Sequence, residues 1–273
     1  MKKVTFGYVL CVITLFLMLA ISLLPMYLMF ATSTKSATEF TTNFWGIAIP
    51  PKWENYVIAW NGIKHYVFNT LICSAMTVGF STIIALLSGY AFAKLKFKGR
   101  DAIYMTFMAF RMVPGTLVLI PNFLIAYRLG LYNTFWGVVL PGLAGTSFMP
   151  MILIMNSFQA IPDSLFEAAR IDGANEWILM RKILLPLGKP IILTTMLFTF
   201  FGTIGSYTWP LLILRDDSMK TVAIGLQAFA GQYGVNYGVQ MAAYSIVAGA
   251  LMLLVGLTMK TYINGITAGA VKG

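Results

Sequence analysis

The sequence predicts an all-α membrane protein with six transmembrane helices and both termini in the cytoplasm. Three observations lead to this fold class: 59% of the 273 residues are hydrophobic, only 10% are charged, and the mean hydropathy is +0.79. A soluble globular domain carries roughly 25% charged residues, and a disordered chain needs low hydrophobicity. The composition therefore excludes an ordinary soluble enzyme and a disordered protein.

Six apolar runs separate the charged segments, and each is close to the roughly 20 residues that an α-helix needs to cross the hydrocarbon core. The predicted spans cover residues 6–30, 66–93, 102–126, 135–158, 190–214 and 240–262. The first run is far longer than the ~7–15-residue apolar region of a signal peptide, so we expect a retained helix. Residues 1–273 are thus predicted to form a single transmembrane domain.

The basic residues predict the orientation. Nineteen Lys and Arg residues against nine Asp and Glu residues give a net charge of +10. With both termini inside, twelve of the nineteen lie in cytoplasmic segments and six outside, and Arg111 is left within the third span. Because short cytoplasmic loops are usually enriched in Lys and Arg, we interpret the positive charge as a topology signal and predict no nucleic-acid partner.

Residue types that perform chemistry are scarce. Cys11 and Cys73 lie in apolar runs and form neither a disulfide framework nor a zinc pattern. The single histidine, His65, is expected to be an interfacial residue. Gly188 and Lys189 are followed by a proline, so they do not form a G-x-x-x-x-G-K-[ST] phosphate loop. No catalytic residue and no metal site is predicted.

The longest polar loop on the predicted cytoplasmic side, residues 159–189, reads as two short helices joined by a glycine turn. Ser164 and Glu167 match the S-x-x-E capping box. Gly173 is placed to end the first helix in the left-handed conformation, and the second helix is predicted to end before Pro186. Such short helices are unstable alone in water, so they rest either on lipid headgroups or against another protein.

The residues of this loop resemble a known family. Glu167-Ala-Ala169, Asp172-Gly-Ala174 and Ile183-x-x-Pro186-Leu187 resemble the EAA loop of binding-protein-dependent ABC importer permeases, and the Asp-Gly-Ala wording resembles the carbohydrate branch with its maltose-type members. Residues 89–100 are similar to the family's turn after the second span, and residues 264–273 to the tail of the shorter maltose-type permease.

This resemblance implies a type I, maltose-type ABC importer permease fold, in which the 159–189 loop couples the chain to a separate ATPase. The residues implied in that coupling are Glu167, Ala168, Ala169, Asp172, Gly173 and Pro186. The tail at residues 268–273 is implied to reach between the ATPase subunits. ATP and Mg would be bound by those partner subunits, and this chain would bind no cofactor.

The implied complex lies in the lipid of a bacterial cytoplasmic (inner) membrane. It contains a second homologous permease subunit, two copies of an ABC ATPase subunit and an extracytoplasmic solute-binding protein. The implied function is import of a carbohydrate or oligosaccharide, with an acidic sugar as one possibility. An ABC permease for a non-sugar solute such as a polyamine stays open, although an arginine in the path suits a cation poorly.

Two other classes are less favoured by the residues. A secondary transporter would need carboxylates within its spans, whereas all nine acidic residues fall in predicted loops. A membrane enzyme would need an intramembrane cluster of His, Asp or Glu, and the predicted spans contain none.

Three residues are candidates for the substrate path. Arg111 lies ~13 Å into the third span at 1.5 Å per residue, where a charge usually faces the bundle interior or a wet cavity. It either binds an anionic group of the substrate or snorkels and pairs with a helix terminus or a partner residue. Tyr207 and Trp209 either contact a sugar ring by stacking or hydrogen bonding or serve as packing residues.

Proline and glycine predict interruptions in the middle of two spans, where transporter sites and hinges tend to lie. The third span contains Pro114-Gly115 and Pro121, and the fifth contains Gly202, Gly205 and Pro210. Such residues are also ordinary in membrane helices, so they indicate a substrate path only weakly.

Overall fold

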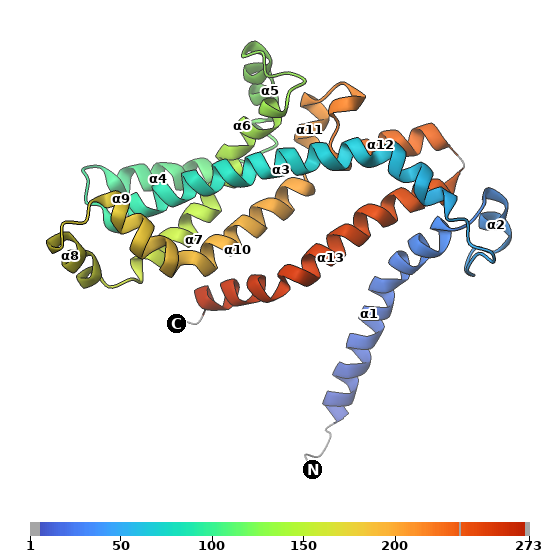
Figure 1. Cartoon of the computed structure of the whole chain (residues 1–273), viewed down its shortest axis with the longest axis horizontal. Coiled ribbons are helices and arrows are strands. Elements are labelled where there is room, and N and C mark those ends of the chain that lie inside the picture. The colour runs from blue at the N-terminus through green and yellow to red at the C-terminus, as the bar shows by residue number, and fades with distance from the viewer. Residues whose placement is uncertain (1–5, 235, 271–273) are drawn as a thin grey trace. The chain divides into compact units, whose positions relative to one another are not determined.

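The structure is a computed structural model that describes residues 6–234 and 236–270, and within these ranges every regular element is helical (Figure 1). Side chains are described for residues 7–234 and 236–260. The predicted all-α class is confirmed. The tail at residues 268–273, implied to reach the ATPase, lies outside the described side chains and partly outside the described backbone.

The chain divides into two compact units, which are considered separately. The first unit contains the residues up to Lys64 together with Gly225–Leu253; the second contains His65–Ile224 and the residues from Leu254 onward. In the first unit lie α1 (Phe6–Ser33) and α2 (Ala37–Thr42). Three helices have residues in both units: α3 (Glu54–Lys94), α12 (Val222–Tyr233) and α13 (Tyr237–Ala270).

The second unit holds the remaining elements. They are α4 (Arg100–Arg111), α5 (Leu119–Arg128), α6 (Phe135–Thr146), α7 (Phe148–Gln159), α8 (Asp163–Ile171), α9 (Glu176–Leu179), the π-helical turn η1 (Met180–Leu184), α10 (Leu185–Ile204), α11 (Thr208–Ile213) and the 3-10 turn η2 (Asp217–Met219).

Four helices in the described part of the chain are long and apolar enough to cross a membrane. They cover Gly7–Ser33, Glu54–Lys94, Glu176–Ile204 and Tyr237–Lys260. The pair α6 and α7, bent by 44°, makes a fifth if it is counted as one span. The predicted third span, residues 102–126, is divided between α4 and α5. Six spans and cytoplasmic termini therefore stay a prediction.

The backbone is interrupted at both places where proline and glycine predicted it. α4 ends at Arg111 and α5 begins at Leu119, and the intervening segment contains Pro114-Gly115. Proline has no N–H and its ring clashes with the preceding turn of a helix. α10 ends at Ile204, with Gly205 as its C-cap, before α11 begins. The predicted third and fifth spans are thus broken helices.

The predicted capping box at Ser164 and Glu167 is wrong. α8 already begins at Asp163, with Pro162 at the N-cap and no side-chain capping bond. Pro162, at φ −58°, takes the N-cap position two residues before Ser164, so the helix has already begun where Ser164 would cap it. The same S-x-x-E pattern does form a capping box at the start of α2, where Ser36 and its partner three residues later bond reciprocally.

The predicted end of the second loop helix before Pro186 is also wrong. α9 passes through the π turn η1 directly into α10, and Pro186 lies in the first turn of α10. Proline cannot donate a backbone hydrogen bond, and the chain accommodates it by widening the preceding turn, as in the bond from Leu185 N to Met180 O. The loop and the following helix are therefore one continuous element.

In the first unit, the segment between α1 and α3 folds around a buried lysine. Lys35 Nζ donates to the carbonyl oxygens of Asn43 and Phe44, both at 2.8 Å. Asn55 Nδ2 donates to Ser33 O and Lys35 O, both at 2.9 Å. Burial lowers the pKa of Lys35 from its usual value. The carbonyl acceptors compensate the cost of burying an ammonium group.

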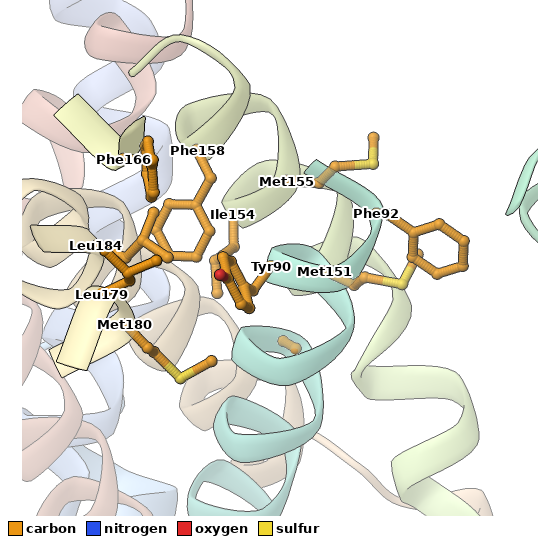
Figure 2. Close-up of a cluster of buried hydrophobic side chains, with 11 residues drawn as sticks. Tyr90, Phe92, Met151, Ile154, Met155, Phe158, Phe166, Leu179, Met180 and Leu184 are labelled. Carbon is orange, nitrogen blue, oxygen red and sulfur yellow. The ribbon is translucent and has the colours of Figure 1, made fainter. Parts of the chain in front are cut away.

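The second unit has a core where α3, α7 and the predicted cytoplasmic loop meet (Figure 2). Its buried residues are Ala85, Tyr90, Phe92, Met151, Ile154, Met155, Phe158, Phe166, Leu179, Met180 and Leu184. Gly89 allows α3 to approach α7 closely, since an added Cβ would lie 3.0 Å from Ile154 Cγ2 and 3.2 Å from Met151 O. This core places the loop against the C-terminal end of α3.

Candidate functional site

The loop implied in coupling is built on a left-handed glycine, as predicted. Gly173 has φ +83°. Its N–H bonds to Arg170 O at 3.0 Å, and Ala174 N bonds to Ala169 O at 2.9 Å. These two bonds form a Schellman motif, which satisfies the last carbonyls of α8. Asn175 then caps α9 by accepting from Ile178 N at 2.9 Å.

One face of α8 buries apolar side chains and the opposite face is exposed. Phe166 is buried in the core, and Ala169 packs against it. Glu167 and Ala168 are exposed, and Ile171 is 87% exposed. Residues three and four apart lie on the same face of a helix. The exposed α8 face, defined as Glu167, Ala168 and Ile171, therefore combines a carboxylate, a small residue and a large apolar side chain.

Ile171 was not among the residues that the sequence implied in coupling. Its spacing could have indicated it, because it follows Glu167 by four positions, while Phe166 and Ala169 point to the core. Asp172 and Gly173 are exposed beyond it. Pro186 is also exposed, but it belongs to α10 and is not part of the exposed α8 face. Among the described residues, Glu167 has no salt bridge, whereas Asp163, Arg170 and Glu176 around it are paired.

A cavity of about 700 Å³ lies between the two interrupted helices of the second unit. Its wall includes Arg111 at the end of α4, Thr77 of α3 and Trp209 of α11. Further polar side chains on the wall are Asn122, Thr146, Thr203 and Ser206. Ligand sites of this size are typically apolar with a few convergent polar groups. The interruptions therefore open a space of the size and lining expected for a small ligand.

Arg111 is the charged group on this wall. It is the last residue of α4, and its exposed guanidinium has one weak contact, from Nη1 to Gly145 O at 3.5 Å. No salt bridge of Arg111 occurs among the described residues. The helix dipole favours a cation at a helix C-terminus. This interaction uses no N–H group, so most of the five donors of the guanidinium stay available.

Trp209 and Tyr207 differ in their placement. Trp209 Nε1 donates to Gly137 O at 3.0 Å, so its single donor is already used and only its ring is available to the cavity. Gly137 is required there, because an added Cβ would meet Leu131 O at 2.1 Å. Tyr207 is not one of the residues that line the cavity. The cavity thus brings together two of the three predicted path residues.

Asn122, Thr203 and Ser206 were not predicted as lining residues. Each lies within about one turn of a helix interruption, and this proximity is the feature of the sequence that could have identified them. Across the described residues, no group of three or more His, Cys, Asp or Glu side chains could hold a metal ion.

The chain belongs to the family of binding-protein-dependent transport system inner membrane components, whose family model matches residues 81–266. It is therefore a membrane-embedded permease of an ABC transport system, as its loop residues predicted. It is 30% identical to the probable ABC transporter permease protein YurM of Bacillus subtilis, over 95% of this chain and 87% of that protein.

Two further relatives carry names that state a substrate. The maltose/maltodextrin transport system permease protein MalG of Vibrio vulnificus is 33% identical over 85% of this chain and 77% of its own length. The arabinooligosaccharides transport system permease protein AraQ of Bacillus subtilis is 28% identical over 96% of this chain and 95% of its own.

A solved structure supports the fold. A chain of a bacterial ABC transporter involved in the import of the acidic polysaccharide alginate superposes with a TM-score of 0.82 and 23% identity, covering 96% of this chain and 98% of that one. Another structure of a bacterial alginate ABC transporter, in complex with an alginate pentasaccharide-bound periplasmic protein, gives a TM-score of 0.68 at 16% identity. The architecture of an ABC importer permease is thus established.

Proposed function

We propose that this chain is one transmembrane subunit of an ATP-driven importer that moves a carbohydrate or oligosaccharide across a bacterial cytoplasmic membrane. The relatives MalG and AraQ support the substrate class, because their names state maltodextrin and arabinooligosaccharide transport. The exposed α8 face carries the proposal. It offers an exposed isoleucine and a carboxylate that forms no salt bridge with the described residues, on a helix that the rest of the unit holds in place.

The exposed α8 face would dock on a separate ATPase subunit, which would bind ATP and Mg. Glu167 would be the polar contact, and Ile171 would fill an apolar depression of the partner. Gly173 would set the turn that presents both residues. An exposed carboxylate flanked by apolar surface is suited to such a contact, since charge gives specificity and apolar area gives affinity.

The cavity would be the substrate path of this subunit. The ring of Trp209 would offer an apolar platform to a sugar ring, and the polar side chains on the wall would hydrogen-bond its hydroxyl groups. Arg111 would pair with a carboxylate on an acidic sugar, because a guanidinium matches carboxylate geometry with two parallel hydrogen bonds. We therefore include an acidic oligosaccharide among the expected substrates.

The complete importer would contain a second homologous permease, two ATPase subunits and an extracytoplasmic solute-binding protein. In this assembly the chain would cross the membrane six times, with the predicted third and fifth spans as broken helices and both termini in the cytoplasm. A periplasmic partner is present in one structurally similar transporter.

The first experiment is co-purification of the ATPase from detergent-solubilised membranes. We compare the wild type with Glu167→Ala plus Gly173→Asp, and we expect the variant to lose an ATPase subunit that the wild type retains. Asp101→Ala is the matched control, because Asp101 is an exposed carboxylate of α4 outside the loop. If the wild type co-purifies no ATPase, the importer proposal fails and the loop is a surface amphipathic element.

A further inference from the structure

The C-terminal end of α3 holds the first loop helix through a lysine. Lys94 Nζ lies 2.6 Å from both Ile161 O and Asp163 Oδ1. It also lies 4.7 Å from the centre of the Phe166 ring. The Lys94 side chain is only 6% exposed, whereas that of Asp163 is 78% exposed. A largely desolvated ammonium group with a carbonyl, a carboxylate and an aromatic face around it binds more firmly than a surface ion pair.

The same end of α3 holds the second loop helix through a tyrosine. The hydroxyl of Tyr90, which is buried in the core, donates to Glu176 Oε2. The other oxygen of Glu176 accepts from Arg170 Nη2 at 3.0 Å. Arg170 lies in the last turn of α8 and Glu176 in the first turn of α9. This carboxylate therefore joins α3, α8 and α9 across the Gly173 turn.

Tyr90 and Lys94 are four residues apart and lie on the same face of α3. Both loop helices are thus attached to one side of one helix, and the apolar core fills the space behind them (Figure 2). These contacts link segments separated by 86 and 69 residues in the chain. Polar contacts of this kind fix the orientation of the loop helices relative to α3, which apolar packing alone would leave adjustable.

The same helix also reaches the cavity. Thr77 of α3 lies on the cavity wall, about 20 Å along the helix axis from Tyr90 at 1.5 Å per residue. We propose that Tyr90 and Lys94 are positioning residues that make α3 move together with the ATPase-docking loop, so that ATP-driven movement of the loop changes the cavity. This inference rests on the proposed docking function of the α8 face.

The test uses the complete importer, with its ATPase and binding protein, reconstituted into liposomes. Lys94→Met keeps the apolar stem and removes the ammonium group; Tyr90→Phe keeps the ring and removes the donor. We expect each to keep the ATPase bound while substrate imported per ATP hydrolysed falls roughly 3- to 30-fold, the usual range for coupling through such networks. Lys94→Arg, which retains a charged donor, should stay near the wild-type ratio.

Two matched controls separate this role from general stability. Lys98→Met removes an exposed lysine from the same turn region, and Tyr104→Phe removes a hydroxyl from a tyrosine that packs on the same core. Both should leave import per ATP unchanged. A fall in the controls equal to that in Lys94→Met would overturn the proposal, because it would reflect nonspecific loosening of the core.

A second measurement follows the cavity directly. Ser206→Cys, in a Cys11→Ala and Cys73→Ala background, reports how fast a thiol reagent reaches the cavity wall with and without ATP. We expect ATP to change this rate in the otherwise unmodified protein and no longer in Lys94→Met. An unaltered ATP response in Lys94→Met, or loss of ATPase binding in it, would refute a transmitting role. Absence of ATPase from every sample, wild type included, would instead refute the docking function.

Discussion

The loop at residues 159–189 and the cavity use their polar side chains in opposite ways. In the loop, Asp163 accepts from Lys94 of α3, and Glu176 accepts from Arg170, both at hydrogen-bonding distance. On the cavity wall, Arg111 makes one hydrogen bond to the described residues, a long one of 3.5 Å to Gly145 O. The loop helices continue through a proline without interruption, whereas the helices around the cavity are broken. Satisfied polar groups suit the proposed role of the loop in transmitting movement, and available polar groups suit the proposed role of the cavity in binding a ligand.

Burial sharpens this contrast between the two cations. Lys94 is almost fully covered and Arg111 is exposed to the cavity. Removing Lys94 would leave the part-buried carbonyl oxygen of Ile161 without its donor, which is destabilising, whereas water would solvate the exposed carboxylate of Asp163. Removing Arg111 would leave no described carboxylate without its partner. Each substitution should therefore affect a different property of the protein.

The largest effect is expected from Arg111→Gln on import of an acidic oligosaccharide. Loss of a charge-assisted hydrogen bond costs ~1.5–3 kcal/mol, so uptake should fall roughly 10- to 100-fold while the complex still assembles. Arg111→Lys keeps the charge without the planar fork and should recover part of the uptake. Normal uptake by Arg111→Gln in a transport assay would contradict a role for this arginine in substrate binding.

The next largest effect tests the loop through Gly173→Val. An added Cβ meets nothing within 4 Å, so the strain expected here comes from the left-handed backbone at φ +83°. That conformation costs a non-glycine residue ~1–2 kcal/mol, and more for a β-branched one, so ATP-driven uptake should fall roughly tenfold. Gly173→Asn is the matched control, because asparagine tolerates this conformation. Equal uptake by the two variants would show that the turn geometry is unimportant.

A smaller effect is expected from Trp209→Phe. The change removes the hydrogen bond to Gly137 O and keeps an aromatic surface, so the free energy of unfolding should fall by about 0.5–1.5 kcal/mol with modest loss of uptake. Trp209→Ala should reduce uptake further, because it also removes the aromatic ring on which a sugar would stack. If both variants transport equally well, Trp209 is a packing residue, and thermal unfolding in detergent would reveal only its structural role.

The smallest effect concerns pH. The hydrogen bond from Lys94 holds the pKa of Asp163 below its usual value of 3.8. For a carboxyl whose pKa is lowered in the folded state, the stabilisation is present above 3.8 and is lost as the pH falls through the lowered value. Pepsin cleavage in residues 159–189, divided at each pH by cleavage of an unfolded reference peptide, should therefore rise as the pH falls below 3.8. Glu176 is also a paired carboxylate of this loop, so Asp163→Asn should show a smaller rise, not none; a rise equal to that of the wild type would exclude Asp163 as a contributor.

Local features of the fold were predictable from the sequence, and distant contacts were not. The interruptions at Pro114-Gly115 and Gly205 and the left-handed Gly173 follow from backbone chemistry within one turn. The capping box at Ser164 failed because Pro162, two residues earlier, starts the helix first. The bond between Lys94 and Asp163 joins residues 69 apart, and periodicity carries no information on such pairs.

The candidate site was predictable to a similar extent. The alanine pattern after Glu167 indicated a contact surface, but the exposure of Ile171 depends on which side of α8 meets the core. Trp209 was recognised as an aromatic residue near the path, whereas the use of its N–H by Gly137 depends on how α11 packs on α6. In both cases the missing information was the orientation of one helix relative to another.

The π turn at Met180–Leu184 also fixes a rotational phase between the loop and the helix that follows it. A π turn contains about one residue more than an α turn, so it absorbs one extra residue while the helices on its two sides stay in phase. Deleting one residue within Met180–Leu184 would therefore give an ordinary α turn and leave α10 in its present orientation. A second deletion, or an insertion, would rotate α10 by about 100° relative to the loop and turn the buried threonines Thr194, Thr195 and Thr199 away from their present neighbours. One deletion at the π turn should therefore be tolerated, and any other change of length there should not.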